Sequence, residues 1–137
     1  MDNSWGEYLW HVMHTVALGY PDSPGIDDRR NYAQFYTNLQ YVLPCAKCRQ
    51  HYRDNLARIP IDSHLESKAA LFAWTVSVHN IVNDALGKVA WTVEQALAFY
   101  TGNKSGKNGK HVMLLVLLAV IVAVLVACVY LKKRRYS

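Results

Sequence analysis

The sequence predicts an all-α protein: a compact four-helix bundle with a short fifth helix, followed by a C-terminal transmembrane helix. Three observations support this fold class. Apolar residues in the first 100 positions recur at helical spacing, no convincing run of alternating residues marks a strand, and a long uncharged segment lies near the C-terminus.

The first predicted helix covers residues 5–19, where the apolar side chains fall on one side of a helix. Ser4 is a suitable N-cap, and Glu7, three residues later, completes a capping box. The segment YPDSPG at residues 20–25 contains two prolines and a glycine and is typical of a turn.

The second and third predicted helices meet at a proline. Asp27 or Asp28 opens the second helix, which carries aromatic and aliphatic residues along one side. Pro44 ends it, because a proline disfavours helical backbone in the residue before it. The third helix begins near Cys45 and runs to about Ala57.

The fourth and fifth predicted helices follow a linker at residues 59–63. Ser63 is the expected N-cap of the fourth helix, again with a glutamate, Glu66, three residues later. This helix runs to about residue 86 and ends at Gly87. Thr92 is the expected cap of the short fifth helix.

We expect four segments in the chain: a helical domain at residues 1–100, a flexible basic linker at 101–111, a transmembrane helix at 112–131 and a basic tail at 132–137. At about 1.5 Å per residue, the uncharged run would span about 30 Å, the hydrocarbon thickness of a bilayer. A buried helix is the alternative, but so small a domain has no core that could cover it on all sides.

The N-terminal sequence lacks the basic and apolar regions of a signal peptide. We therefore expect a single-pass C-terminal anchor with the domain in the cytosol. The positive-inside rule weakly favours the opposite orientation, since slightly more basic residues follow the apolar run than closely precede it. Translocation of a whole domain without a signal is the larger demand.

The net charge of +5 comes from the residues that flank the apolar run. Seven basic residues lie there: Lys104, Lys107, Lys110, Lys132, Lys133, Arg134 and Arg135. They are typical of membrane-interface anchors, and without them the chain has a net charge of about −2. The charge pattern therefore argues against nucleic-acid binding.

A Cys-x-x-Cys pair, Cys45 and Cys48, stands at the start of the third predicted helix. Cys128, the only other cysteine, lies in the apolar run, so a disulfide framework is excluded. The positive end of a helix dipole favours the reactive thiolate, and the close spacing allows a disulfide to form and reopen. A redox-active dithiol is therefore one interpretation of the pair.

Two other interpretations of the pair remain open. Zinc could be bound by Cys45, Cys48 and His51, but a structural zinc site needs four ligands and no second cysteine pair is present. A thioredoxin-like motif follows a strand, whereas a helical pattern precedes this one.

Polar residues interrupt two otherwise apolar helices. His79 and Asn83 are four residues apart and share a face of the fourth helix, bordered by Asn80 and Lys88. Buried histidine and asparagine must be hydrogen-bonded, so these residues either satisfy one another in the core or bind a ligand. Residues of the first helix that recur every four positions, as a core aromatic stripe or a platform for a flat ring, are Gly6, Trp10 and His14.

Taken together, these motifs resemble the Erv/ALR family of FAD-dependent sulfhydryl oxidases, of the type found in large DNA viruses. The matching residues are Gly6, Trp10, His14, Tyr20-Pro21, Leu43-Pro44-Cys45, Cys48-Arg49, His51-Tyr52, Trp74, His79-Asn80, Val82-Asn83, Leu86-Gly87-Lys88 and Trp91. They occur in the family's order over roughly residues 5–100.

The resemblance implies a helical domain that holds FAD without a covalent bond. Cys48 would lie against the flavin ring, and Cys45 would exchange with incoming thiols. Contacts to FAD are implied for Gly6, His51 and the following residues: Trp10 and His14 on the adenine side; His79, Asn80 and Asn83 at the adenosine and isoalloxazine; and Lys88 and Trp91 closing the site. No metal is implied. The partners would be dithiol client proteins or a thioredoxin-like redox protein, O2 as electron acceptor and, commonly, a second copy of the chain.

The sequence departs from the family pattern in two ways. Glu7 stands where many members have an arginine, which removes one expected contact to FAD. A second structural disulfide and a separate shuttle dithiol are also missing, so we expect clients to attack Cys45 directly and helix packing to hold the fifth helix.

The expected activity is disulfide formation in client proteins, with electrons passing through Cys45 and Cys48 to FAD and then to O2, releasing H2O2. In a virus, the clients would be virion proteins, with the domain in the host cytoplasm or at a virion membrane. The alternatives are a membrane-anchored zinc-binding interaction module and a disulfide-exchange carrier without FAD.

Overall fold

The computed structural model describes residues 5–102, 117–118 and 121, and the chain divides into two units, residues 1–101 and 102–137. The first unit is helical, and none of its described residues forms a strand. Its elements are α1 (Trp5–Leu18), α2 (Ile26–Val42), α3 (Ala46–Arg58), the 3₁₀ helix η1 (Ile61–His64), α4 (Lys68–Ala85) and α5 (Val93–Tyr100). The predicted all-α class is confirmed for this unit.

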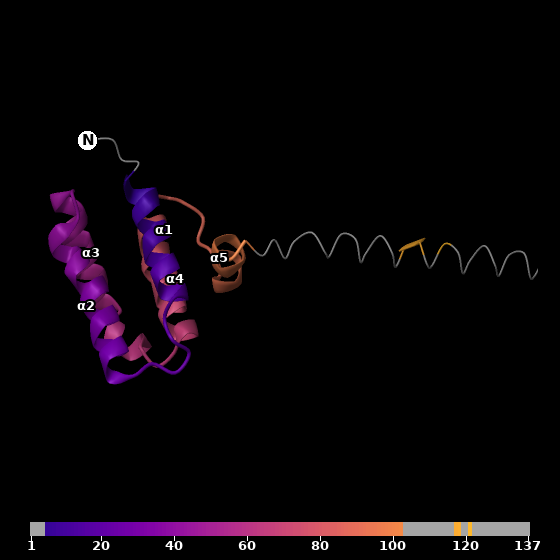
Figure 1. Cartoon of the computed structure of the whole chain (residues 1–137). Helices are drawn as coiled ribbons and strands as arrows, with labels where there is room; N and C mark the ends of the chain where they lie inside the picture. Colours follow the sequence, from indigo (N-terminus) through magenta and orange to yellow (C-terminus); the bar gives the residue numbers. More distant parts are fainter. Residues whose placement is uncertain (1–4, 103–116, 119–120, 122–137) are drawn as a thin grey trace, which may run out of the picture. The chain divides into compact units, whose positions relative to one another are not determined.

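The helices pack as two neighbouring pairs, α1 with α4 and α2 with α3 (Figure 1). The short helix η1 contacts both α2 and α4, and α5 packs against α4 and α1. Figure 1 shows α5 nearly end-on beside α4, at a large angle to the four longer helices. The predicted arrangement of four helices and a short fifth is therefore present.

Buried aromatic side chains join the helices through hydrogen bonds to backbone carbonyls. The hydroxyl of Tyr36 donates to the oxygen of Met13 at 2.7 Å, and that of Tyr52 donates to the oxygen of Tyr36 at 3.1 Å. The indole of Trp74 donates to the oxygen of Ile59 at 2.9 Å. Burial raises the pKa of Tyr36 and of Tyr52, so both remain neutral donors. These bonds fix α2 against α1 and α3, and the end of α3 against α4.

The junction of α2 and α3 has the local structure that the sequence predicts. Leu43 is extended, with ψ 135°, as expected for a residue before a proline, and α2 ends at Val42. Cys45 is the N-cap of α3, and its Sγ accepts a hydrogen bond from the Cys48 amide at 3.2 Å. This capping places the dithiol at the positive end of a helix dipole.

The predicted start of the fourth helix is wrong. Ser63 belongs to η1, and the N-cap of α4 is Ser67, whose hydroxyl accepts a hydrogen bond from the Ala70 amide at 3.2 Å. The reason is tertiary packing, because Ile61 and Leu65 on either side of Ser63 are buried. Their burial keeps this segment in a 3₁₀ turn, where Ser63 and Glu66 cannot form a capping box.

The predicted end of the fourth helix is confirmed. Gly87 has φ +64°, a left-handed conformation that favours glycine. Its amide donates to Asp84, and the Lys88 amide donates to the carbonyl oxygen of Asn83 at 2.8 Å, which is the pattern of a Schellman motif. Thr92 caps α5, as predicted, by accepting from the Gln95 amide.

The predicted transmembrane helix at residues 112–131 lies outside the described residues except at 117, 118 and 121, as do the linker from residue 103 onward and the tail at 132–137. No described helix is long and apolar enough to cross a membrane. Ser4, the predicted cap of the first helix, is also outside the described residues.

Candidate functional site

A cleft of about 1440 Å³ opens among α1, α3, α4, α5 and the segment that joins α4 to α5. Roughly 300–1,000 Å³ is usual for a small-molecule site, so this cleft has room for a large ligand. The predicted site residues that line it are Gly6, Trp10, Cys48, His51, His79, Asn83, Lys88 and Trp91. Cys45, His14 and Asn80 do not line it.

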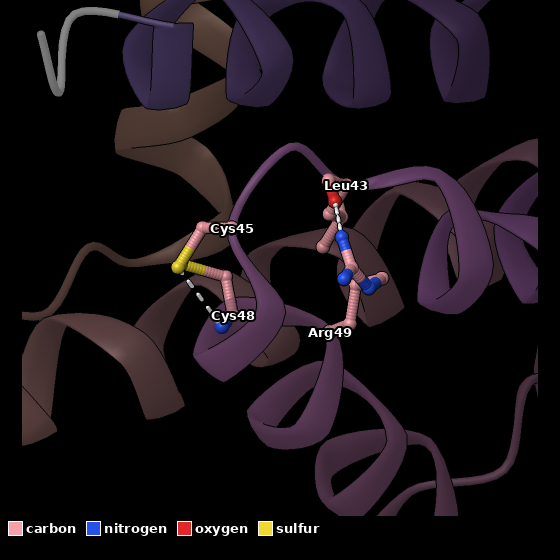
Figure 2. The surroundings of a disulfide bond; sticks show 4 residues. All are labelled: Leu43, Cys45, Cys48 and Arg49. Carbon is pink, nitrogen blue, oxygen red and sulfur yellow. Dashed lines mark hydrogen bonds between the residues drawn. A yellow bond between two sulfur atoms is a disulfide. The ribbon is translucent and has the colours of Figure 1, made fainter. Parts of the chain in front are cut away.

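Cys45 and Cys48 form a disulfide at the start of α3. Figure 2 shows this disulfide on one side of the turn and Arg49 on the other, where its guanidinium donates a hydrogen bond to the carbonyl oxygen of Leu43. Leu43 is itself buried. The Arg49 hydrogen bond thus holds the turn on the side opposite the disulfide. Of the two cysteines, only Cys48 lines the cleft.

Trp10 and His79 form a flat stack at the cleft wall. Their ring centroids are 4.1 Å apart, with an interplanar angle of 6°. Burial, together with the positive charge of Lys88, lowers the pKa of His79 to about 4. The imidazole is therefore neutral near pH 7, as the indole always is. Two neutral aromatic rings in a cleft wall are suited to contact the ring of a ligand.

His14 is buried behind this stack. Its Nε2 lies 3.1 Å from Nδ1 of His79, and its Nδ1 lies 2.9 Å from the hydroxyl oxygen of Thr75. Burial, followed by the proximity of His79 and His11, lowers the pKa of His14 to about 3. His14 therefore fixes the orientation of the His79 ring through a hydrogen bond from within the bundle.

Asn80 holds the segment between α4 and α5. Its amide nitrogen donates to the Trp91 carbonyl oxygen at 2.8 Å, and its amide oxygen accepts from the Trp91 amide at 2.9 Å. Both polar groups of the side chain are thereby directed at backbone. The structure places Asn80 where it positions Trp91, which lines the cleft.

Asn55 is a cleft residue that sequence reasoning missed. Asn55 and Asn83 are largely buried residues that line the cleft, and no hydrogen bond joins either side chain to another described residue. No fully buried side-chain N or O atom in the described part of the chain lacks a partner, so the amide atoms of Asn55 and Asn83 must be partly accessible, with hydrogen-bonding capacity for a ligand. Asn55 also borders a second cavity of about 380 Å³ between α3 and α4. A polar residue at i+3 from Tyr52, on the buried side of an otherwise polar helix, is the only sequence signal.

Phe99 and Tyr100 were also missed. Phe99 is 63% exposed although it lines the cleft, and it contacts Trp91 edge-to-face with centroids 5.1 Å apart. The ring centroids of Tyr100 and His14 are 4.5 Å apart. The sequence signal was a pair of aromatic residues at the end of a short helix. The two side chains form a hydrophobic wall on the α5 side of the cleft.

Charges of both signs border the cleft. Lys88, positioned by the Schellman motif, and Glu7 on α1 both line it and are exposed. The carboxylate of Glu7 would oppose an anionic ligand that Lys88 attracts.

No metal site is evident in the described part of the chain, where no group of three or more His, Cys, Asp or Glu side chains is arranged to hold an ion. With Cys45 and Cys48 joined in a disulfide, the two sulfurs are not available as thiolate ligands. The zinc hypothesis is therefore not favoured.

Sequence comparison finds relatives in viruses. The chain is 44% identical over 94 residues to a probable FAD-linked sulfhydryl oxidase of Acanthamoeba polyphaga mimivirus, covering 68% of this chain and 66% of the relative. It is 36% identical over 84 residues to a putative FAD-linked sulfhydryl oxidase of Invertebrate iridescent virus 3, covering 61% of this chain and 57% of the relative. The chain thus spans less than two thirds of these curated relatives.

Structural comparison identifies the same fold in yeast proteins. The crystal structure of the yeast Erv1 core superposes with a TM-score of 0.70 at 23% identity, covering 75% of this chain and 86% of that one. The FAD-binding domain of Erv1 from Saccharomyces cerevisiae superposes with a TM-score of 0.66 at 26% identity, covering 70% and 90%. The profile of the Erv1 / Alr family matches residues 7–101, and the chain therefore belongs to that family.

Proposed function

We propose that this protein is an FAD-dependent sulfhydryl oxidase that forms disulfide bonds in client proteins. The observation that carries the proposal is a disulfide at a helix N-terminus, one cysteine of which lines a cleft with stacked aromatic rings and two asparagine side chains. The names of the viral relatives, which describe FAD-linked sulfhydryl oxidases, support the same reaction.

The residues of the cleft fit FAD. Trp10 and His79 offer flat surfaces to a ring, and the Asn55 and Asn83 amides offer hydrogen bonds. Lys88 offers a positive charge to the pyrophosphate. The remaining candidate contacts are Gly6, Cys48, His51 and Trp91, with His14 and Asn80 acting from behind the cleft wall.

The cysteines would exchange disulfides with the client. A client thiolate attacks Sγ of Cys45, the Cys45–Cys48 bond breaks, and Cys48 leaves as a thiolate. A second client thiolate then attacks the client sulfur of the mixed disulfide, and Cys45 is released. The client is oxidised by two electrons and the Cys45–Cys48 pair is reduced by two. Bound FAD would supply the two-electron acceptor that restores the disulfide and delivers the electrons to O2 as H2O2.

The test is oxygen consumption with dithiothreitol as substrate. We expect the full-length wild-type chain to consume oxygen, Cys45→Ser and Cys48→Ser to abolish turnover, and Cys128→Ser to leave it unchanged. Undiminished oxygen consumption by either of the first two variants would contradict the mechanism. Disulfide exchange without oxygen consumption by the wild type would indicate a carrier instead.

We infer the remaining properties from the sequence and the family. We propose that the clients are proteins with paired thiols, or a thioredoxin-like partner that accepts electrons from such proteins and passes them to Cys45. The apolar run at residues 112–131 is proposed as a single-pass anchor, with the oxidase domain in the cytosol or at a virion membrane. A homodimer is proposed from the exposed apolar residues Tyr8 and Val12 on α1.

A further inference from the structure

One nitrogen of the His79 imidazole has no hydrogen-bond partner among the described residues. Its Nδ1 faces His14 and its ring face stacks on Trp10. Its Nε2 makes no hydrogen bond to another described residue. No side-chain N or O atom in the described part of the chain is both fully buried and unpaired, so Nε2 must be partly accessible. Since His79 lines the cleft, Nε2 is the atom that it offers to a ligand.

The hydrogen bonds behind His79 determine which of its nitrogens carries the proton. The hydroxyl of Thr75 donates its only hydrogen to the carbonyl oxygen of Phe72 at 2.7 Å. Thr75 must therefore accept from Nδ1–H of His14 at 2.9 Å. Nε2 of neutral His14 is then unprotonated and accepts from Nδ1–H of His79 at 3.1 Å. In neutral His79, Nε2 is left without a proton.

Electrostatics keeps both imidazoles neutral. Burial is the largest cause of the low pKa of His14 and of His79. The titratable groups that face them are His11 and Tyr100 at His14, and Lys88 at His79, and none of these stabilises an imidazolium. Neither imidazole is paired with a carboxylate in the described part of the chain.

We propose that Thr75 and His14 are positioning residues that hold His79 as a neutral hydrogen-bond acceptor toward the cleft. Building on the proposed function, His79 then takes an O–H or N–H donor of FAD, from a sugar hydroxyl or a ring. It does not take the pyrophosphate, because phosphate oxygens carry no proton near neutral pH and would face a lone pair. The anionic part of the cofactor is left to cations such as Lys88.

The first test needs no cofactor. In the full-length chain labelled with ¹⁵N-histidine, the nitrogen shifts of each ring distinguish the two neutral tautomers and the cation. His79 is assigned by comparison with His79→Gln. Near pH 7 we expect His79 to be neutral and protonated at Nδ1. A neutral His79 protonated at Nε2, or a cationic His79, would overturn the proposal whatever the protein binds.

The second test uses Thr75→Val, which keeps the volume of the side chain and removes its hydroxyl, with Thr75→Ser as the matched control. Without the hydroxyl, the buried Nδ1 of His14 loses its acceptor, so we expect His14 to become protonated at Nε2 and His79 to reverse with it. FAD affinity, measured by flavin fluorescence, should fall about tenfold in Thr75→Val and stay near the wild-type value in Thr75→Ser. An unchanged tautomer and affinity in Thr75→Val would overturn the proposal.

The two tests separate this proposal from the proposed function. A wild-type chain that shows the expected tautomer but binds no FAD would support the hydrogen-bonded chain and refute the cofactor. A chain that binds FAD with the opposite tautomer would support the cofactor and refute the role assigned to Thr75 and His14.

Discussion

Acidification should destabilise the folded protein through two histidines. The pKa of His14 is lowered from 6.5 to about 3, and that of His79 to about 4. In the unfolded chain both rings take up protons below pH 6.5, whereas the folded protein keeps them neutral. The unfolded state therefore binds more protons, and the free energy of unfolding must fall as the pH falls from 6.5 toward 4.

The magnitude follows from the size of the pKa shifts. Each histidine that stays neutral costs about 1.4 kcal/mol per pH unit below its unfolded pKa. His14 is almost completely buried, so at pH 5 its share is about 2 kcal/mol. His79 borders the cleft and is partly screened by solvent, so its share is smaller, and the total loss should lie at about 2–4 kcal/mol.

Urea denaturation of the full-length chain without added flavin, at several pH values between about 7.5 and 5, measures this loss. In His79→Gln one titrating group is gone, so the loss should shrink toward the 2 kcal/mol of His14 alone. A free energy of unfolding that changes by less than about 1 kcal/mol over this range in the wild type would refute the reasoning, since His14 could not then be buried and neutral.

Three substitutions test other parts of the site. Asn80→Ala removes both hydrogen bonds to Trp91 and should lower the free energy of unfolding by about 1–3 kcal/mol in urea denaturation; unchanged stability would show that Asn80 does not hold the segment before α5. Glu7→Arg should tighten FAD binding up to about fivefold at low salt, an effect that high salt removes, whereas Glu66→Arg, away from the cleft, should not. Asn55→Ala should weaken FAD binding about tenfold while costing less than about 1 kcal/mol of stability, and equal affinity would exclude Asn55 as a contact.

Helix boundaries were predictable where a local signal decides them. Pro44 ends α2, Gly87 ends α4 and Thr92 begins α5, each through backbone geometry or capping within a few residues. Ser63 has an equally good local signal and was nevertheless wrong as a cap. Burial of the neighbouring Ile61 overrides it, and burial depends on distant packing that a local pattern does not contain.

In the candidate site, too, the sequence predicted what local motifs determine and not what tertiary packing determines. The motifs identified Trp10 and His79, which share one wall of the cleft. They did not separate residues that line the cleft from those behind it, such as His14 and Asn80, because neighbouring positions on one helix differ only in the direction of the side chain. Asn55 belongs to no motif, and its place in the cleft wall depends on how α3 packs in the folded domain.

The central claim is that this cleft binds FAD. The most direct measurement is the visible absorption spectrum of the purified full-length chain, followed by identification of whatever denaturation releases. We expect the spectrum of a bound flavin and release of FAD. A colourless, folded protein that also fails to take up added FAD would contradict the claim.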